Sequence, residues 1–396
     1  MRNGVVGFSG AKLAEARLAR GISSRKALAD LMQKAPSTVI RWEDGETAPE
    51  TSALTELAHV LSMPEDFFLT ERKGEGGLSF FRSLAGALKS DRGVQEVRLL
   101  WLQDIAAVAD HYAYLPNVDV PNMLAGRSFK TLREEEIEAI ASDARNHWGL
   151  ALRPIVDMVA FLEKIGVIVA AETMETTQLD GVSRWGADGR PYILLANDKQ
   201  SFSRRQFDAA HELGHLLIHR GVNQTELLED HRLIEDQAHR FASAFLLPAA
   251  QYVAEVNSGA IWELERLKAR WKVSIKAQIV RLQRLNVIDK GNALRLYKAY
   301  SARGYNANEP FDDVWELQQP SLLSDVFRAL IDSAEISKEV LRHDLPLLPH
   351  DVESLTNLPS GWLSQESARV VLLKQTKSVP RNAEGKEGQV IPLKRD

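Results

Sequence analysis

Residues 207–220 read FDAAHELGHLLIHR and combine an amphipathic helical pattern with two histidines four positions apart. Residues at this spacing lie on one face of a helix, so His211 and His215 can present two imidazoles to one metal ion. Glu212 lies about 100° further round the helix, beside such an ion rather than facing it. This place suits a base that takes a proton from a water molecule whose pKa zinc has lowered to about 7.

A zinc site of this kind needs a third protein ligand. Catalytic zinc keeps three protein ligands and one open position, and two histidines with one glutamate form an established set. A second predicted helix contains the stretch IEDQAHRFASAFLLP (234–248), with Glu235 near its start. Glu235 is the first candidate for the third ligand. The other candidates are Asp236, His231 and His239.

Two neighbouring residues have supporting roles in this interpretation. Gly214, between the two histidines, allows another backbone to approach the motif helix closely. His219 is interpreted as a packing residue or as a partner of a ligand, rather than as a ligand itself.

Two plainer interpretations compete with a catalytic metal. The stretch can be an ordinary amphipathic helix with surface histidines, although a carboxylate-bearing helix follows it. It can also hold a purely structural zinc, but such sites are usually closed by four protein ligands and are often rich in thiolates. The chain contains no cysteine. A structural site would also have no use for Glu212.

Composition bounds the class of protein. With 396 residues, 44% of them hydrophobic and 26% charged, the chain is expected to be globular and to form two or three domains. The lack of cysteine excludes disulfides and thiolate metal sites, and is compatible with the cytosol. We find no apolar run of about 18 residues and no signal-peptide pattern. A cytoplasmic protein without a membrane partner is therefore expected.

The N-terminal region predicts helices over residues 10–69, and its centre reads LADLMQKAPSTVIRWEDGE (28–46). A helix, a short turn, a helix and two further helices form the helix-turn-helix arrangement. The region resembles the Xre/Cro-repressor family, most clearly in STVIRWEDGE (37–46). The resemblance implies a recognition helix over 36–42 and a partner that is double-stranded operator DNA. The implied DNA-facing residues are Arg25, Pro36, Ser37, Thr38 and Arg41, whereas Val39 and Trp42 are expected in the core.

Charge favours a nucleic-acid partner for this region. Residues 1–42 contain eight basic residues and two acidic ones in a chain whose net charge is -5. Contacts to phosphates need such a local surplus. Two positions depart from the family pattern, because Ser24 replaces a usual glutamine and Gln33 replaces a usual turn glycine. A helix-turn-helix kept for docking a protein or for dimerisation is the alternative.

The central region resembles the ImmA/IrrE family of zinc metallopeptidases over about 145–310. The resemblance rests on SRRQFDAAHELGHLLIHR (203–220) followed by IEDQAHRFASAFLLP, and on two flanking stretches. These are GVSRWGADGRPYILLAND (181–198), similar to the family's strand pair, and LKARWKVSIKAQIVRLQRLNVID (267–289), similar to its helical segment. The resemblance implies zinc bound by His211, His215 and Glu235, with Glu212 as general base. His239 stands where many relatives carry Asn.

A peptide substrate also needs a surface that aligns it. An extended peptide can add itself as a strand to an exposed sheet edge. The stretch PYILLAN (191–197), directly before the motif helix, is the candidate edge. Its alternative is an internal strand of the core.

The expected fold class is α+β and predominantly helical, with a small sheet at 167–172 and 190–198 and helices over most of 79–145 and 250–345. The C-terminal helices resemble a small cap on the peptidase region. The expected divisions are a helix-turn-helix domain (1–70), a linker with a helical segment (71–144), a zincin-like core (145–250), a helical completion of the peptidase (251–310), a C-terminal helical region (311–373) and a disordered tail (374–396).

Two functions follow from these expectations. The first is a DNA-binding regulator with a zinc-dependent endopeptidase that cleaves a repressor, a toxin or another partner in a phage, stress or toxin–antitoxin switch. The second is a non-proteolytic repressor or antitoxin that uses the zinc domain as a sensor or scaffold. The intact Glu212 favours the first, since a scaffold needs no base. Dimerisation is plausible because such repressors commonly read paired half-sites.

Overall fold

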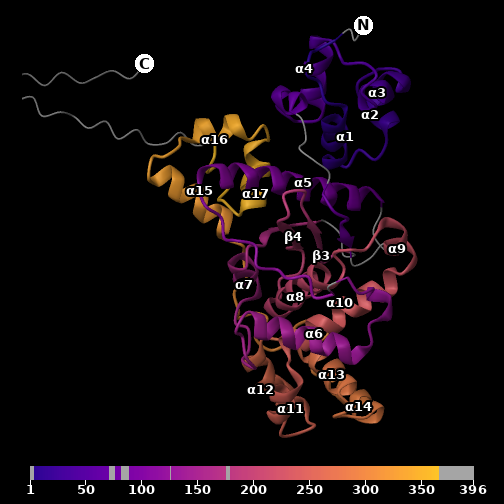
Figure 1. Ribbon diagram of the computed structural model, residues 1–396, viewed down its shortest axis with the longest axis vertical. Helices are drawn as coiled ribbons and strands as arrows, with labels where there is room; N and C mark the ends of the chain where they lie inside the picture. The colour runs from indigo at the N-terminus through magenta and orange to yellow at the C-terminus, as the bar shows by residue number, and fades with distance from the viewer. Residues whose placement is uncertain (1–3, 71–75, 82–88, 125, 175–178, 365–396) are drawn as a thin grey trace, which may run out of the picture. The chain divides into compact units, whose positions relative to one another are not determined.

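The computed structural model describes residues 4–70, 76–81, 89–124, 126–174 and 179–364 (Figure 1). The described chain is a predominantly helical α+β protein, as the sequence predicts, and its small sheet has four strands. The tail at 374–396, expected to be disordered, lies outside the described residues. Within the described residues, no helix is both long and apolar enough to cross a membrane.

The N-terminal region forms the predicted helix-turn-helix arrangement, and its helices begin where capping residues predict. Ser9 and Ser24 cap the first two helices by accepting hydrogen bonds from the backbone N–H groups of Lys12 and Ala27. Pro36 occupies the first position of the third helix, where its missing N–H costs nothing. The elements are α1 (Gly10–Ala19), α2 (Arg25–Leu31), α3 (Pro36–Glu43), α4 (Thr51–Val60) and the 3-10 helix η1 (Glu65–Leu69).

The turn between α2 and α3 keeps a left-handed backbone without the usual glycine. Gln33 has φ = 51°, a region that side chains with a Cβ enter at a cost of about 1 kcal/mol. Gln33 thus adopts the backbone conformation that a glycine would favour at this turn, and the strain stays in the folded chain.

The sheet has the order β1-β3-β4-β2, built from β1 (Phe80–Phe81), β2 (Ile168–Glu172), β3 (Gly181–Trp185) and β4 (Pro191–Ala196). Strand β3 runs antiparallel to both of its neighbours, while β2 and β4 are parallel. The prediction that 191–197 forms an exposed edge is wrong, because β4 pairs on both sides. Its run of apolar residues lacks alternation, which is typical of a strand buried on both faces.

Strand β1 is a second correction, because residues 79–145 were expected to be helical. Among the described residues, the first helix of this region is α5 (Lys89–Tyr112). A strand of two residues carries no periodicity of its own, and only its pairing with β3 identifies it.

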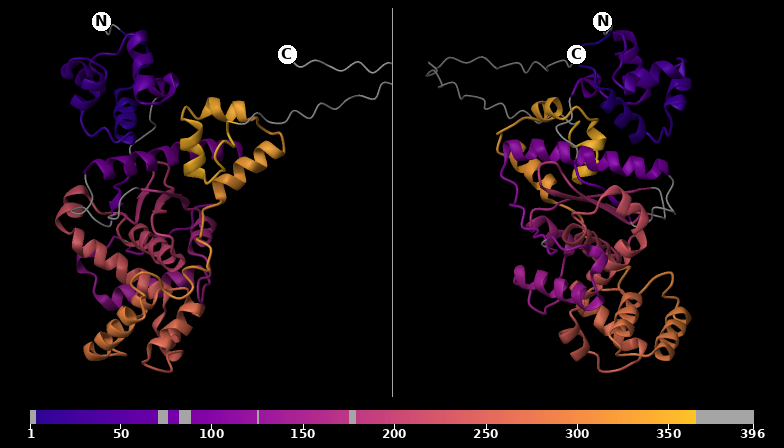
Figure 2. Two further views of the ribbon diagram at one scale, coloured as in Figure 1. Left: turned by 180° about the vertical axis from the view of Figure 1, so that it is seen from behind. Right: turned by 45° about the vertical axis from the view of Figure 1, so that its right-hand side comes forward.

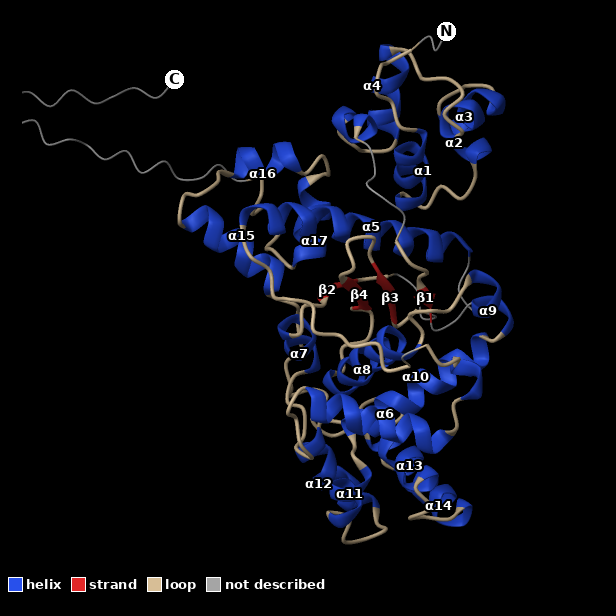
Figure 3. Cartoon of the chain, in the orientation of Figure 1, coloured by secondary structure: helices blue, strands red, loops and turns tan. Residues whose placement is uncertain are grey.

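Alternate residues along the strands face two different helical layers (Figure 3). Val169, Ile193 and Leu195 belong to the core that contains α8 (Phe202–Ile218). Ile168, Ala170, Val182 and Leu194 belong to the core that contains α5. The sheet thus lies between the motif helix and the long helix that follows β1.

Helix α10 (His231–Leu246) packs on α8 at Gly214, where an added Cβ would lie 3.3 Å from the Cα of Ala238. The expected close approach at Gly214 is confirmed. Further helices complete this side of the protein. They are η2 (Phe129–Thr131), α6 (Glu134–His147), α7 (Met158–Lys164), α9 (Gln224–Glu229), α11 (Ala249–Ala254), α12 (Ile261–Trp271), α13 (Ile275–Arg284) and α14 (Lys290–Ala302).

The C-terminal helices do not cover the motif helix. Helices α15 (Leu322–Asp332) and α17 (Pro349–Thr356) contact α5 and β2, and α16 (Lys338–Asp344) follows α15. Their apolar residues join the core on the α5 side of the sheet. These helices therefore pack on the peptidase-like region from the face of the sheet opposite α8, and a role as a cap on that region stays a prediction.

Helix α5 also carries the N-terminal helices (Figure 2). The ring of Phe67 meets Trp101 of α5 edge-on at 5.9 Å, and Nζ of Lys12 lies 3.0 Å from a carboxylate oxygen of Asp104. Arg20, directly after α1, pairs with Asp351 of α17 at 2.9 Å. The helix-turn-helix and the outer face of the sheet consequently share one continuous apolar core.

Candidate metal centre and DNA-binding surface

The side chains of His211, His215 and Glu235 converge where α8 crosses α10. The two histidine Nε2 atoms lie 3.0 Å apart, and the Glu235 carboxylate oxygens lie 3.2 Å and 3.3 Å from them. Donors bound at about 2.0 Å to a tetrahedral zinc ion stand roughly 3.3 Å from one another. The spacing and the chemistry of this donor set therefore fit a zinc ion.

The proximity of these three side chains also shifts the pKa values of Glu235 and His215. Burial alone would raise the pKa of the Glu235 carboxyl, but the imidazoles of His215 and His211 hold that pKa well below its ordinary value. Burial would lower the pKa of His215, and the carboxylate of Glu235 outweighs it and raises that pKa. The cluster is thus an ionised carboxylate held between two imidazoles, an arrangement in which a divalent cation can replace the imidazole protons.

A chain of hydrogen bonds fixes the orientation of His215. The amide nitrogen of Gln237 donates to the carbonyl oxygen of Phe129 at 2.8 Å, so its oxygen faces Nε2 of His219 at 3.0 Å. Burial lowers the pKa of His219 to about 3, which leaves this ring neutral with its proton on Nε2. Its Nδ1 then accepts from Nδ1 of His215 at 3.1 Å. The Nε2 lone pair of His215 is therefore directed at the metal position.

His219 is buried, packs against Phe80 and Phe129 and contacts the predicted ligand His215, which is compatible with both roles that the sequence left open for it. Gln237 escaped sequence analysis, since a glutamine on an amphipathic helix carries no signal of its own. Its position two residues after Glu235 becomes meaningful only once α10 is packed against α8.

Glu212 lies against β3. A Cβ built on Gly181 would come within 2.9 Å of Oε1 of Glu212, so the missing side chain makes room for the carboxyl group. Burial raises the pKa of Glu212 to about 7, against the opposing positive charge of His215. A carboxyl group with this pKa can both accept and return a proton near neutral pH. Gly181 is a further residue that the sequence analysis missed.

The other three candidates for the third ligand have different positions. Asp236 is engaged by Arg240 at 2.6 Å and by Arg284 at 3.2 Å. Nε2 of His231 lies 3.9 Å from Glu235. The ring of His239 lies 4.6 Å from that of His211, and its ligand atom falls within 4.8 Å of those of His211 and Glu235.

His211 and Glu235 thus belong to two possible donor sets, one completed by His215 at 3.0 Å and 3.3 Å from them and one completed by His239. His231 and His239 lie one helical turn before and after Glu235.

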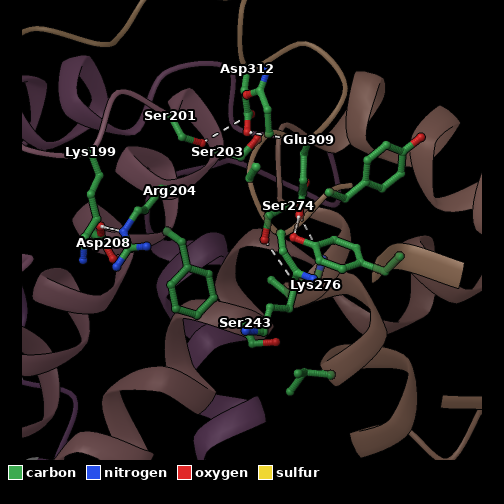
Figure 4. Close-up of a pocket in the computed structure, with 18 of the residues that line it drawn as sticks. Lys199, Ser201, Ser203, Arg204, Asp208, Ser243, Ser274, Lys276, Glu309 and Asp312 are labelled. Atoms are coloured by element: carbon green, nitrogen blue, oxygen red, sulfur yellow. Dashed lines mark hydrogen bonds and ion pairs between the residues drawn. The ribbon is translucent and has the colours of Figure 1, made fainter. Parts of the chain in front are cut away.

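A cavity of about 600 Å³ adjoins the centre through Phe207 and His239 (Figure 4). Its volume is in the range of small-molecule and peptide side-chain sites. Lys199 and Arg204 line one side of it, and Lys276 at the start of α13 lines another. The sequence gave no sign of this cavity, since its wall is assembled from α8, α10, α13 and the segment 305–312.

The proposed DNA-facing residues lie mostly on the surface. Pro36, Ser37 and Arg41 are exposed and Thr38 is half-buried on α3. Val39 and Trp42 are buried, as expected of core residues. Arg25 differs from the others, because its guanidinium is bound to Glu43 at 2.7 Å and to Asp44 at 2.8 Å.

The basic surplus of residues 1–42 is smaller than a count of charges indicates. Most of these basic side chains are paired with acidic groups beyond residue 42. Arg17 and Arg25 bind Glu43, and Lys34 lies 3.4 Å from Glu56. Lys12 and Arg20 are also paired, with Asp104 and Asp351. Much of the basic surplus is therefore neutralised by ion pairs within the folded chain. Arg2, counted in that surplus, lies outside the described residues.

Comparison with known families identifies two segments of the chain. Residues 162–283 match the model of the IrrE N-terminal-like domain, a peptidase family, and this span includes the whole donor set. Residues 13–68 match a helix-turn-helix family. The chain therefore combines a helix-turn-helix domain of the DNA-binding type with a metallopeptidase-like domain, as the sequence motifs indicated. No curated protein matches the chain.

Proposed function

We propose that this chain is a cytoplasmic, DNA-binding regulator whose metal centre hydrolyses a peptide bond in a cognate repressor or another partner protein. The observation that carries the proposal is the convergence of His211, His215 and Glu235 beside the carboxyl group of Glu212. A purely structural metal site has no use for such a group, whereas hydrolysis of a peptide bond needs a proton acceptor. The switch served is of the phage, stress or toxin–antitoxin type.

The three ligand residues would hold zinc, which when bound polarises a carbonyl group and lowers the pKa of water. Glu212 takes the proton from the attacking water and returns it to the leaving amine, a role that suits a buried carboxyl group beside the donor set. His219 and Gln237 keep His215 in the tautomer that leaves Nε2 free to ligate. His239 lines the cavity and would meet a substrate carbonyl there.

The partner of the N-terminal domain is double-stranded operator DNA, read by the exposed side of α3. Ser37 and Arg41 would contact base edges, and Pro36 and Thr38 would lie close to the backbone. Arg25 would act mainly by holding Glu43, and the half of its guanidinium that is exposed would face phosphate. A homodimer would present two such helices to paired half-sites.

The test uses the zinc-loaded full-length chain and a degenerate peptide library analysed by mass spectrometry. Glu212→Gln is expected to retain about one zinc per chain but to lose cleavage by about 10²-fold or more, because the amide cannot take the proton. The double variant His211→Ala/His215→Ala should lose both zinc and cleavage. Equal cleavage by Glu212→Gln and the parent chain would show the mechanism to be wrong.

One observation favours the non-proteolytic alternative, in which the zinc domain is a scaffold or sensor. Only 0–2% of the surfaces of His211, Glu212 and His215 is exposed, which leaves a substrate little access. If the parent and every variant with an opened site failed to cleave the library while binding zinc and operator DNA, this alternative would be the better one.

A further inference from the structure

The outer edge of β3 is occupied by a segment of the same chain. Residue Phe80 pairs with Ser183, and residue 81 pairs with Val182, in antiparallel register. The backbone N–H of Gly77 donates to the carbonyl oxygen of Trp185 at 2.7 Å, which extends the contact along the strand. Residues 76–81 thus fill the edge that the sheet would otherwise offer to an added strand.

This edge runs past the catalytic base. Gly181 of β3 contacts the carboxyl group of Glu212, and Ser183 follows two residues later on the same face of the strand. Any strand paired with β3 therefore lies next to the position where a scissile peptide would have to be held. Pairing of an extended peptide with an exposed sheet edge is a general way to align its carbonyl groups.

Phe80 connects this strand to the metal centre. Its ring stacks on His215 with centroids 5.1 Å apart and an interplanar angle of 12°. It also approaches the ring of His219 at 6.0 Å, and only 3% of its surface is exposed. The side chain is therefore seated in a site whose floor is a predicted metal ligand.

The entrance to this edge is narrow. A Cβ on Gly76 would lie 2.6 Å from Nη2 of Arg184 and 3.0 Å from the carbonyl oxygen of Trp185, and one on Gly77 would lie 3.3 Å from that oxygen. Small residues are thus favoured three and four positions before the aromatic side chain. The chain supplies them as GGLSF over residues 76–80.

We propose that residues 76–81 occupy the place of a substrate strand on β3 and must leave it before a substrate can bind. The inference rests on the proposed peptidase function and deepens it, because the occupant indicates the substrate class. That class is an extended segment with an aromatic or large apolar side chain in the site of Phe80, preceded by small residues. The near-complete burial of Glu212 and the two histidines is the consequence of this internal strand.

The first experiment measures release of zinc from the loaded full-length chain to a chelating dye. Phe80→Asp removes the stacked ring and places a charge on the buried edge, so the segment should detach and zinc release should accelerate by about tenfold or more. Tyr114→Ala, which removes a fully exposed aromatic ring, is the matched control and should release zinc at the parental rate. Parental release by Phe80→Asp would overturn the proposal.

A peptide with the sequence of residues 76–81, added to the Phe80→Asp variant, should slow zinc release again. Millimolar concentrations are expected to be needed, because this is roughly the effective concentration of a tethered segment. The same peptide with alanine in place of its first phenylalanine should have no effect. Equal slowing by both peptides would contradict a specific site for the aromatic side chain.

A second variant keeps Phe80 in place. It distinguishes occupation of the β3 edge by residues 76–81 from simple support of the His215 ring by Phe80. The chain has no cysteine, so Phe81→Cys/Val182→Cys introduces a single thiol pair at positions paired across β1 and β3. Oxidation should lower the rate of cleavage of the peptide library by about tenfold or more while zinc stays bound. Reduction of the disulfide should restore the rate. Equal cleavage in both redox states would overturn the proposal.

Failure of the proposed function gives a different pattern. The parent, the reduced cysteine pair and Phe80→Asp would then all leave the library intact, while zinc release would still accelerate in Phe80→Asp and be slowed by the peptide. That result would support the covering strand over a metal site that is not catalytic.

Discussion

Gly181 leaves the space that the carboxyl group of Glu212 fills, since a Cβ at this glycine would stand 2.9 Å from Oε1. The three atoms nearest to that Cβ position all belong to Glu212, so a substitution here acts first on the proposed base rather than on the predicted metal ligands. Gly181→Ala is expected to displace the carboxyl group and to lower kcat for peptide cleavage by about 10- to 100-fold, with about one zinc per chain retained.

The measurement is steady-state cleavage beside zinc content. Gly259→Ala is the matched control, because an added Cβ there meets no atom within 4 Å and its backbone needs no positive φ. Loss of zinc in Gly181→Ala would mean that the glycine supports the metal site as a whole rather than the base.

Gln237→Leu should weaken zinc binding by about 10- to 100-fold, because partners of ligand histidines contribute to metal affinity on this scale. Without the amide oxygen, the N–H at Nε2 of His219 loses its hydrogen-bond acceptor. The His219 tautomer whose Nδ1 accepts a hydrogen bond from Nδ1 of His215 is then no longer favoured. Competition with a chelator of known affinity measures the change. Gln251→Leu, which removes a glutamine bonded only locally to Glu255, serves as the control, and an equal effect there would refute the relay.

Arg41→Ala is expected to weaken operator binding and to reduce the slope of log affinity against log salt by about one if the side chain meets a phosphate. A loss confined to the cognate operator, with the salt slope unchanged, would instead indicate a contact to a base. The measurement is fluorescence anisotropy of a labelled operator at several salt concentrations. Lys276→Ala, an exposed lysine of the peptidase-like domain, should leave both quantities unchanged.

Gln33→Gly should raise the free energy of unfolding by up to about 1 kcal/mol, because the glycine adopts φ = 51° without the penalty of a Cβ. Part of the gain is offset by the greater freedom of glycine in the unfolded chain. Gly21→Ala is the mirror experiment, since Gly21 has φ = 69° and open space around it, and it should destabilise by a similar amount. Thermal unfolding followed by calorimetry compares the two, and a lower Tm for Gln33→Gly would refute the strain.

The fold class and the helix-turn-helix could be predicted because their signals are local. Caps at Ser9 and Ser24, Pro36 at a helix start and the HELGH spacing each act within a few residues of themselves. The edge of the sheet could not be predicted in this way. Strand order depends on which segments pair, and β1 comes from a region whose surroundings read as helix.

The residues of the candidate site also divide into those with local sequence signals and those that depend on packing between distant elements. His211 and His215 share a face because of helical geometry alone. Gly181, Gln237 and Phe80 matter only through packing between elements that are far apart in the sequence. The charge count over residues 1–42 failed for this reason too, because the acidic partners of Lys12 and Arg20 come from α5 and α17.

Helix α5 belongs to neither of the two matched segments, yet its residues Trp101 and Leu102 are fully buried between the N-terminal helices, the sheet and the C-terminal helices. A fragment cut to either family boundary would therefore carry an uncovered apolar surface, and such surfaces favour aggregation. The two halves could not be exchanged for homologous parts without redesigning this helix. Helix α5 thus joins the two family-matched segments into a single folding unit.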